Sequence, residues 1–217
     1  MPDAAPSPAT ARRRQRILEV AARVFAKEGF RHTDVQVIAD LARAGKGTIY
    51  RHFGNKQELF LATVRANVEW LADYVLAQLD GAESAADHLR RIAVSCAEYC
   101  QHHPDLVELT IQERAEFRES VFPTALMFRS DNSGGLEEMI RAGVATGEFR
   151  DVDPHTTSIA FLDLVFGTVV CGCLEGGSRQ LTTRIDRAVD MFLAGVAADP
   201  SALQDSKDAA VDSHIEP

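Results

Sequence analysis

Polar and aromatic side chains crowd residues 46–53, a segment whose composition predicts a short helix. Ile49 and Phe53, four residues apart, supply its apolar side, and a helix this short is not stable alone. The remaining surface carries hydroxyl, imidazole and cationic groups, on Lys46, Thr48, Tyr50, Arg51 and His52. A one-sided row of donors and positive charge is what the major groove of DNA accepts. The segment therefore predicts a recognition helix.

The preceding residues predict two helices that support this segment. Apolar residues recur at helical spacing from about residue 11 to 28, and Gly29 is placed to end that helix. Thr33 and Gln36 then match a capping box, with Thr33 as N-cap. We expect the helix that it opens to direct three side chains inward, those of Val37, Ile38 and Leu41.

A second capping box follows the predicted recognition helix. Asn55 and Glu58 match its pattern and open a long helix that we expect to reach Leu79. With the four-residue turn at 42–45, these elements predict a helix-turn-helix unit.

Charge is divided unevenly along the chain of 217 residues, whose formal net charge is −9. Residues 11–60 hold eleven basic and five acidic residues, a net charge of +6, whereas the rest holds 12 basic and 27 acidic residues, a net charge of −15. A basic module joined to an acidic body is expected when only one part of a protein meets phosphate.

The rest of the chain also has helical periodicity, and no segment shows the alternation of a strand. Helices are predicted over residues 84–102, from 104 through Leu106, Val107, Leu109, Thr110 and Ile111, and over 120–146, 154–174 and 181–197. We expect a break or kink at 130–135, where polar residues and two glycines meet. The fold class is therefore all-α. The predicted domains are a disordered arm at 1–10, a helix-turn-helix domain at 11–60, a helical ligand-binding and dimerisation domain at 61–198 and a disordered tail at 199–217.

The N-terminal motifs resemble the TetR/AcrR family of transcriptional regulators. The resemblance rests on the run Lys46–Phe53 with Asn55, Lys56, Glu58 and Leu59, on the Ile38-Ala39 pair, and on the helix that ends at Gly29-Phe30. It implies a homodimeric, all-helical repressor that binds a pseudo-palindromic operator and is released by a small molecule. The segment 112–118 also looks like one found in a branch of these regulators.

The resemblance also implies which residues touch DNA. Base contacts fall on Lys46, Gly47 and Thr48, and phosphate contacts on Tyr50, His52, Lys56 and Thr33. Physically, Lys46 can donate to guanine, and the backbone N–H groups at Gln36 and Lys46 can meet phosphate. Arg12, Arg13 and Arg14 resemble a basic arm that some members lay along DNA. Two positions depart from the family pattern, because Arg43 replaces a glycine in the inter-helix turn and Gly45 replaces a serine cap.

A small-molecule pocket is expected among the middle helices, where apolar and aromatic residues gather. The candidate lining residues are Trp70, Tyr74, Cys96, Tyr99, Cys100, Phe117, Phe122, Met127, Phe128 and Phe161. Plain core packing is the alternative interpretation for each of them.

The last two predicted helices are the candidate dimer interface, as half of a four-helix bundle across a two-fold axis. The residues assigned to it are Phe161, Val165, Phe166, Val169, Ile185, Val189 and Phe192. Burial within one chain is the alternative.

Other function classes find less support. Cys96, Cys100 and His103 share one helix face, so a metal or thiol sensor is a second hypothesis, although core thiols are the simpler interpretation and no metal or cofactor is assigned. A helix-turn-helix fold used only for protein contacts is a third. No phosphate loop, nucleophile elbow or HExxH motif indicates an enzyme. We expect a cytoplasmic protein, because no secretory signal and no apolar run long enough for a bilayer was found.

Overall fold

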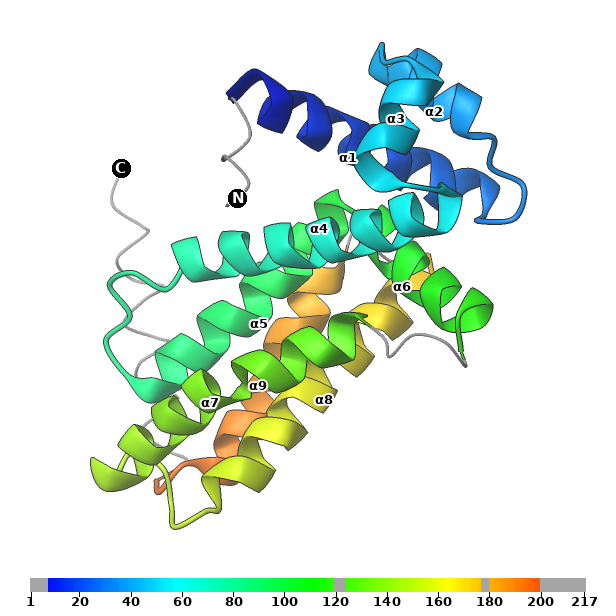
Figure 1. Ribbon diagram of the computed structural model, residues 1–217. Helices are drawn as coiled ribbons and strands as arrows, with labels where there is room; N and C mark the ends of the chain where they lie inside the picture. Colours follow the sequence, from blue (N-terminus) through cyan, green and yellow to red (C-terminus); the bar gives the residue numbers. More distant parts are fainter. Residues whose placement is uncertain (1–7, 119–123, 177–179, 200–217) are drawn as a thin grey trace, which may run out of the picture. The chain divides into compact units, whose positions relative to one another are not determined.

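The computed structural model describes residues 8–118, 124–176 and 180–199, and in the range 125–133 it describes the backbone alone. Within those ranges the chain is helical and has no β-strand, which confirms the all-α prediction. The helices are α1 (Pro8–Glu28), α2 (Val35–Ala42), α3 (Lys46–Phe53), α4 (Lys56–Ala77), α5 (Ala85–His102), α6 (Asp105–Glu116), α7 (Thr124–Ala145), α8 (Pro154–Leu174) and α9 (Leu181–Val196) (Figure 1). Helix α1 begins three residues earlier than predicted. Residues 1–7 and 200–217 of the predicted disordered ends lie outside the described ranges.

The chain divides into two compact units. The first comprises Met1–Ala72 and His103–Phe128, and the second comprises Asp73–His102 and Arg129–Pro217. Helices α1, α2, α3 and α6 therefore belong to the first unit, and α5, α8 and α9 to the second. The residues of α4 and α7 are shared between the units.

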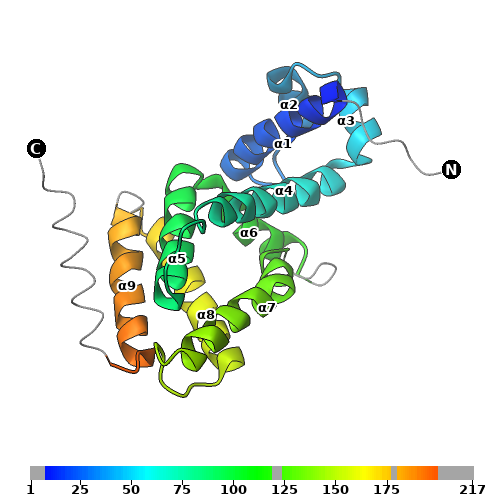
Figure 2. The same ribbon diagram turned by 90° about the vertical axis from the view of Figure 1, so that its left-hand side faces the viewer.

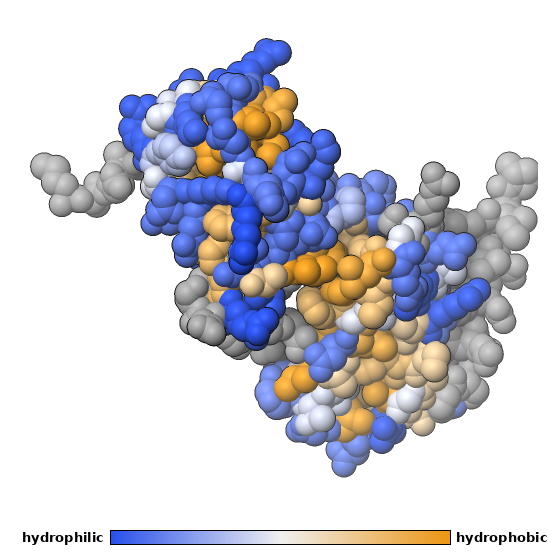
Figure 3. Space-filling model, turned by 90° about the vertical axis from the view of Figure 1, so that its right-hand side faces the viewer, coloured by the Kyte–Doolittle hydropathy of each residue, from blue (hydrophilic) through white to orange (hydrophobic). Residues whose placement is uncertain are grey.

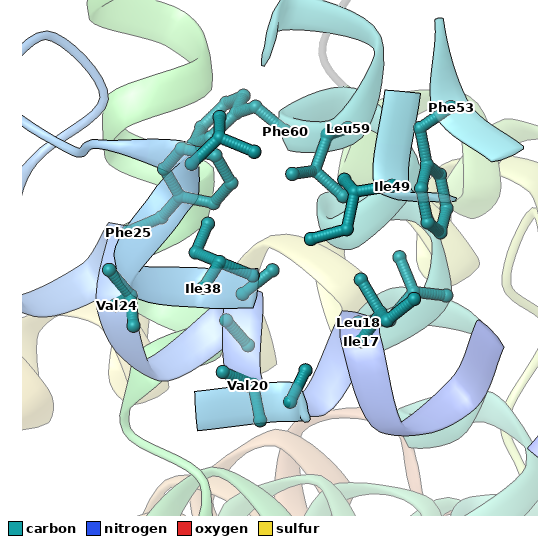
Figure 4. Packing of buried hydrophobic residues seen from close by; sticks show 14 of the residues in the cluster. Ile17, Leu18, Val20, Val24, Phe25, Ile38, Ile49, Phe53, Leu59 and Phe60 are labelled. Carbon is teal, nitrogen blue, oxygen red and sulfur yellow. The ribbon is translucent and has the colours of Figure 1, made fainter. Parts of the chain in front are cut away.

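The core of the first unit forms where α1, α2, α3 and α4 meet. Ile17, Phe25, Ile38, Ile49 and Phe60 are all fully buried there (Figure 4). These residues sit at helical spacing on their own elements, so each amphipathic helix contributes one apolar stripe. This packing stabilises α3, which is too short to persist alone.

An aromatic cluster extends that core toward α6. Phe60 packs edge-on against Phe25 with ring centroids 5.1 Å apart, and Phe30 contacts Phe60 at 5.2 Å. Phe117, at the end of α6, contacts Phe30 at 5.0 Å and Phe60 at 5.6 Å. Edge-to-face rings at these distances stabilise beyond their buried area.

The predicted inward face of α2 was wrong at two positions. Val37 and Leu41 are exposed, at 46% and 58%, whereas Ile38 is buried as expected. The buried stripe runs through Val35, Ile38, Ala39 and Ala42. The reason is the helix start, because the N-cap is Asp34 and the i, i+3, i+4, i+7 series from Val35 faces the core.

The predicted break at 130–135 is wrong. Helix α7 continues through 130–135 without a break. Leu136 and Ile140, just beyond that stretch, are buried, and their packing offsets the weak helical propensity of the glycines.

The second unit is held by α5, α8 and α9, which lie side by side (Figures 1 and 2). Arg90 of α5 donates to Asp186 and Asp190 of α9, each at 2.6 Å. Glu148, in the loop after α7, accepts hydrogen bonds from the first two amides of α5, at Ala85 and Ala86. A carboxylate at a helix N-terminus is stabilising, so this contact fixes the loop to α5.

Candidate nucleic-acid interface

Helix α3 presents a polar surface because only two of its side chains are buried, those of Ile49 and Phe53. Lys46 and Thr48 are half-buried, and Tyr50 is 38% exposed. Gly47 is exposed, and a Cβ added there would meet no atom within 4 Å. The start of α3 is thus open to the close approach of another molecule. Gly45 is its N-cap and provides no side-chain hydrogen bond.

The turn between α2 and α3 has a left-handed residue that is not a glycine. Arg43 has φ 53° and ψ 45°, and among the described residues it alone has a positive φ without being glycine. Its amide donates to Asp40, and the amide of Ala44 donates to Ala39. A non-glycine residue in this conformation costs of the order of 1 kcal/mol. The arginine is therefore strained and the turn geometry is retained.

Thr33 does not cap α2, which corrects the predicted capping box. Its hydroxyl donates to the Gly29 carbonyl at 2.8 Å, and the residue is buried at 4% exposure. Asp34 is the cap, and its Oδ1 accepts from the Gln36 amide at 2.8 Å. Thr33 is thus turned into the protein, and the Gln36 amide already has a partner.

The second predicted capping box is half formed. Asn55 Oδ1 accepts from the Glu58 amide at 2.9 Å, whereas the Asn55 amide donates to the Phe53 carbonyl rather than to Glu58. One side-chain cap is enough to begin α4 at Lys56.

Carboxylates hold two of the predicted DNA contacts in the free chain. Lys46 Nζ lies 3.1 Å from Asp34 Oδ1, and Gln36 Nε2 donates to Asp40 Oδ1 at 2.8 Å. The Gln36 amide, then Lys46, holds the pKa of Asp34 below its usual value. Thr48 accepts a hydrogen bond from Arg51 at 3.2 Å.

The predicted phosphate contact Lys56 is positioned by neutral groups. Its ammonium donates to the Arg31 carbonyl at 3.0 Å and lies 5.0 Å above the Phe30 ring. Such a cation–π contact orients the cation without pairing it directly with a carboxylate.

His52 lies beside the N-terminal part of α1, a neighbour that the spacing did not predict. It lines an open cleft of about 320 Å³ with Arg14, Gln15, Glu69 and Trp70 among others. Arg14, which we expected in a basic arm, lies in α1 with its guanidinium 5.3 Å from the centre of the Phe53 ring. Trp70, predicted as an effector contact, therefore belongs to this cleft of the first unit.

Helix α6 is joined to the end of α1 by polar contacts that sequence reasoning missed. Gln112 accepts from the Phe30 amide and donates to the Phe25 carbonyl, both at 3.0 Å. Glu116 accepts a hydrogen bond from Arg31 at 2.8 Å. Helical periodicity detects apolar residues only, so it could not predict a contact between two charged side chains. The resemblance of segment 112–118 to a segment of some family members was the one feature of the sequence that could have pointed to these contacts.

A buried carboxylate ties α6 to the start of α7. Glu113 is 1% exposed, and it accepts from the Thr124 amide at 2.9 Å and from the Thr124 hydroxyl at 2.5 Å. These bonds satisfy the carboxylate, which would otherwise be costly to bury.

The predicted effector residues do not form one group. Tyr74, Cys96, Tyr99, Cys100 and Phe161 lie in the second unit, whereas Phe117 belongs to the aromatic cluster of the first. Phe122 and the side chains of Met127 and Phe128 lie outside the described residues.

Two tyrosines among the effector candidates of the second unit are in contact. The rings of Tyr74 and Tyr99 are 5.5 Å apart, and the Tyr74 hydroxyl donates to Glu98 at 3.2 Å. Burial raises the pKa of Tyr99 to about 12. The Gln101 side-chain oxygen is buried and accepts no hydrogen bond from the described residues.

The two candidate sensing thiols, Cys96 and Cys100, lie in surroundings that favour the protonated form. Burial raises the pKa of Cys96 to about 12 and also raises the pKa of Cys100. A protonated thiol is a poor nucleophile and a poor metal ligand. His103 belongs to the other unit, and no cluster of three metal-binding side chains occurs in the described parts of the chain.

Most residues predicted at the dimer interface are buried inside one chain. Ile185 and Val189 are fully buried, and so is Phe161, whose ring lies 5.4 Å from that of half-buried Phe192. Val165 and Val169 are buried at 7% and 6% exposure. These side chains form the internal contact of α8 with its neighbours, so a charge at Val165 would test folding and not association.

Phe166, also predicted at the interface, is different, because it is 40% exposed. The other exposed apolar residues of α8 and α9 are Ile159, Leu174 and Met191, with Met191 at 78% exposure. Figure 3 shows apolar surface on this unit. Only 28% of the most apolar window of α8 is buried, and by length and composition the helix could cross a membrane, so the expectation that no run is long enough was wrong.

Comparisons with known proteins agree with this arrangement of helices. Residues 17–63 match the family model "Bacterial regulatory proteins, tetR family", and residues 82–196 match a tetracyclin repressor-like C-terminal domain. The HTH-type transcriptional repressor KstR2 of Mycolicibacterium smegmatis is 30% identical over 158 residues, covering 70% of this chain and 75% of that protein. The repressor NicS of Pseudomonas putida is 31% identical over 152 residues, covering 64% and 67% respectively.

Solved structures share the fold. FadR of Bacillus subtilis in complex with stearoyl-CoA superimposes with a TM-score of 0.71 at 17% identity, covering 83% of this chain and 98% of that one. The ketosteroid regulator KstR2 of Mycobacterium tuberculosis gives a TM-score of 0.62 at 23% identity, with coverage of 85% and 95%.

Proposed function

Because the chain belongs to the TetR family of ligand-responsive, DNA-binding transcriptional regulators, we propose that it is a homodimeric repressor, released from a pseudo-palindromic operator by a small molecule. The observation that carries this proposal is the exposed donor surface of α3, an eight-residue helix whose two buried side chains fix it to the core. The family consists of regulators and is not an enzyme family.

The proposed DNA contacts follow from exposure. Lys46, Gly47 and Thr48 stand at the start of α3, where a recognition helix meets base edges. Tyr50, His52 and Lys56 then serve phosphate oxygens, which position the head without reading sequence. Gln36 contributes its side chain rather than its occupied amide. Thr33 is left out because its hydroxyl is buried.

We assign the dimer interface to the exposed apolar residues of α8 and α9, which are Ile159, Phe166, Leu174 and Met191. Large apolar side chains left exposed on two neighbouring helices favour an association site. A two-fold axis beside them would place two copies of each helix together as a four-helix bundle. Association, rather than a membrane, then covers α8, and the protein acts in the cytoplasm, where its DNA is.

The effector is proposed to be an apolar organic molecule that binds the second unit. The aromatic and sulfur-containing side chains of Tyr74, Tyr99, Cys96 and Cys100 support an apolar ligand. The FadR structure holds stearoyl-CoA, and KstR2 is described as a ketosteroid regulator. Both suggest acyl-CoA and steroid compounds as first candidates.

The test is fluorescence anisotropy on DNA from upstream of the protein's own gene, against a scrambled duplex, over a series of salt concentrations. Competitor-resistant binding with a steep salt dependence supports the proposal. Equal, weak binding to both duplexes, with an intact dimer, contradicts operator recognition and favours a head used for protein contacts. Where binding to the operator is specific, addition of an acyl-CoA or a steroid should release the labelled operator.

A further inference from the structure

The two lysines of the proposed reading head have opposite surroundings. Lys46 is paired with the carboxylate of Asp34 at 3.1 Å. Lys56 is held by the Arg31 carbonyl and the Phe30 ring, which are neutral. Lys46 is therefore paired directly with a carboxylate in the free protein, whereas Lys56 touches neutral groups and interacts with Asp34 only through its charge.

We propose that Asp34 determines specificity: its carboxylate withholds Lys46 from phosphates, so Lys46 adds to binding only where base edges offer it acceptors. This inference rests on the proposed DNA-binding function and assigns a role to a residue that is not itself among the proposed DNA contacts.

The geometry allows Asp34 to act while Lys46 changes partners. Asp34 Oδ1 also accepts from the Gln36 amide at 2.8 Å, and this cap holds the carboxylate at the start of α2 whether or not Lys46 is present. The ion pair is exposed, with 40% of the Lys46 side chain and 63% of the Asp34 side chain accessible. Pairs of this kind are weak in water, so guanine O6 and N7 can displace the carboxylate.

The same carboxylate opposes binding to DNA of arbitrary sequence. Non-specific affinity arises almost entirely from cations that neutralise phosphates. An acid paired with Lys46 removes one such cation and adds a negative charge near the backbone. A protein that must find one operator among many competing sites becomes more specific when its affinity for other sequences falls, whereas a general rise in affinity would not improve its specificity.

The variant Asp34→Asn tests this role, since asparagine keeps the capping oxygen and loses the charge. We expect its affinity for a scrambled duplex to rise about threefold to tenfold, with a salt dependence steeper by about one phosphate contact. Affinity for the operator should change less, so the ratio between the two duplexes falls. Asp34→Ser, which also caps a helix, repeats the measurement if the asparagine variant is unstable.

A matched control is available in the second unit. Asp153 caps α8, accepting from the Thr156 amide at 2.7 Å, and Asp153→Asn makes the same change in net charge. We expect it to leave both affinities unchanged. An equal effect from both variants would overturn the proposal, because net charge alone would then account for it.

The double variant Asp34→Asn/Lys46→Ala shows whether Asp34 acts through Lys46. If it does, loss of the carboxylate changes scrambled-duplex affinity much less in the Lys46→Ala background. An undiminished gain there would contradict the coupling, and a loss confined to the operator would mean that Asp34 itself contacts a base. Wild-type protein without operator preference would refute the proposed function, whereas the scrambled-duplex cycle would still measure the coupling.

Discussion

The first unit, here called the head, and the second unit, here called the body, use helices in opposite ways. Helix α3 has eight residues and buries only Ile49 and Phe53, and the rest of its surface carries hydrogen-bond donors and charged groups. Helix α8 has 21 residues and is apolar nearly all round, yet Phe166 and Leu174 remain exposed in the single chain. The short helix depends on its own chain for stability, whereas the long one still has apolar surface to bury.

This difference bears on what each region can reveal about function. The chemistry of DNA is known and regular, so a row of donors on a supported short helix identifies its partner. Apolar surface is non-directional and suits a core, a second subunit or an effector equally. Its assignment therefore depends on which side chains the neighbouring helices cover.

The largest effect on operator binding is expected at the exposed apolar residues of α8. Phe166→Asp places a charge in the proposed dimer interface and should give monomers, with operator affinity reduced at least about 100-fold because two half-sites are no longer held together. Light scattering and anisotropy measure the two quantities. Ile111→Asp, at 37% exposure in α6, is the control. A Phe166→Asp dimer with unchanged operator affinity would refute the interface.

In the head, Phe60→Ala should be the most destabilising change, by about 3–5 kcal/mol. Phe60 is fully buried and contacts the rings of Phe25, Phe30 and Phe117. Urea unfolding followed by circular dichroism provides the measurement. Truncation of half-exposed Phe166 to alanine should lower the free energy of unfolding far less in the same assay. A comparable loss would mean that Phe166 supports the fold as strongly as Phe60 does.

Lys46 and Lys56 are expected to have different roles, Lys46 in base recognition and Lys56 in phosphate binding. Lys46→Ala should cost about 1–3 kcal/mol of discrimination between operator and altered bases. Lys56→Ala should weaken all duplexes alike and reduce the salt slope by about one. Anisotropy on operator and scrambled duplexes distinguishes them. Indistinguishable effects would count against the division of roles.

The turn offers a smaller effect of the opposite sign. Arg43→Gly removes the strain of a left-handed arginine and should raise the free energy of unfolding by about 0.5–1 kcal/mol, partly offset by greater freedom of the unfolded chain. Arg43→Val should lower it. Thermal unfolding of the three proteins checks the order, and a glycine variant less stable than wild type would mean that the Arg43 side chain stabilises the turn.

The smallest effect concerns an exposed ion pair of the body. The hydrogen bond that His155 Nδ1 donates to the Glu137 carboxylate, at 2.8 Å, raises the pKa of His155 above 6.5. A raised pKa means that the pair stabilises the fold fully below pH 6.5 and stops doing so as pH rises through the folded value. An NMR titration should show this pKa falling toward 6.5 in Glu137→Gln. An unchanged pKa in that variant would assign the shift to another group.

Local sequence determined much of this molecule. Helical periodicity placed α1, α3, α5, α8 and α9, and the run Lys46–Phe53 identified the DNA-binding family, because propensity, capping and motif spacing are properties of neighbouring residues. Gly29 ends α1 as predicted, with a positive φ of 79°. The departures at Arg43 and Gly45 were visible too, although their consequences were not.

Tertiary structure alone decided which of several suitable side chains face inward and which are paired. Thr33 and Asp34 are both good caps, and packing of Val35 selected Asp34. Val165 and Phe166 are equally apolar neighbours, yet only the second is left exposed. The pairing of Asp34 with Lys46 spans 12 residues and two helices. Such choices depend on contacts between elements distant in sequence, which no local pattern records.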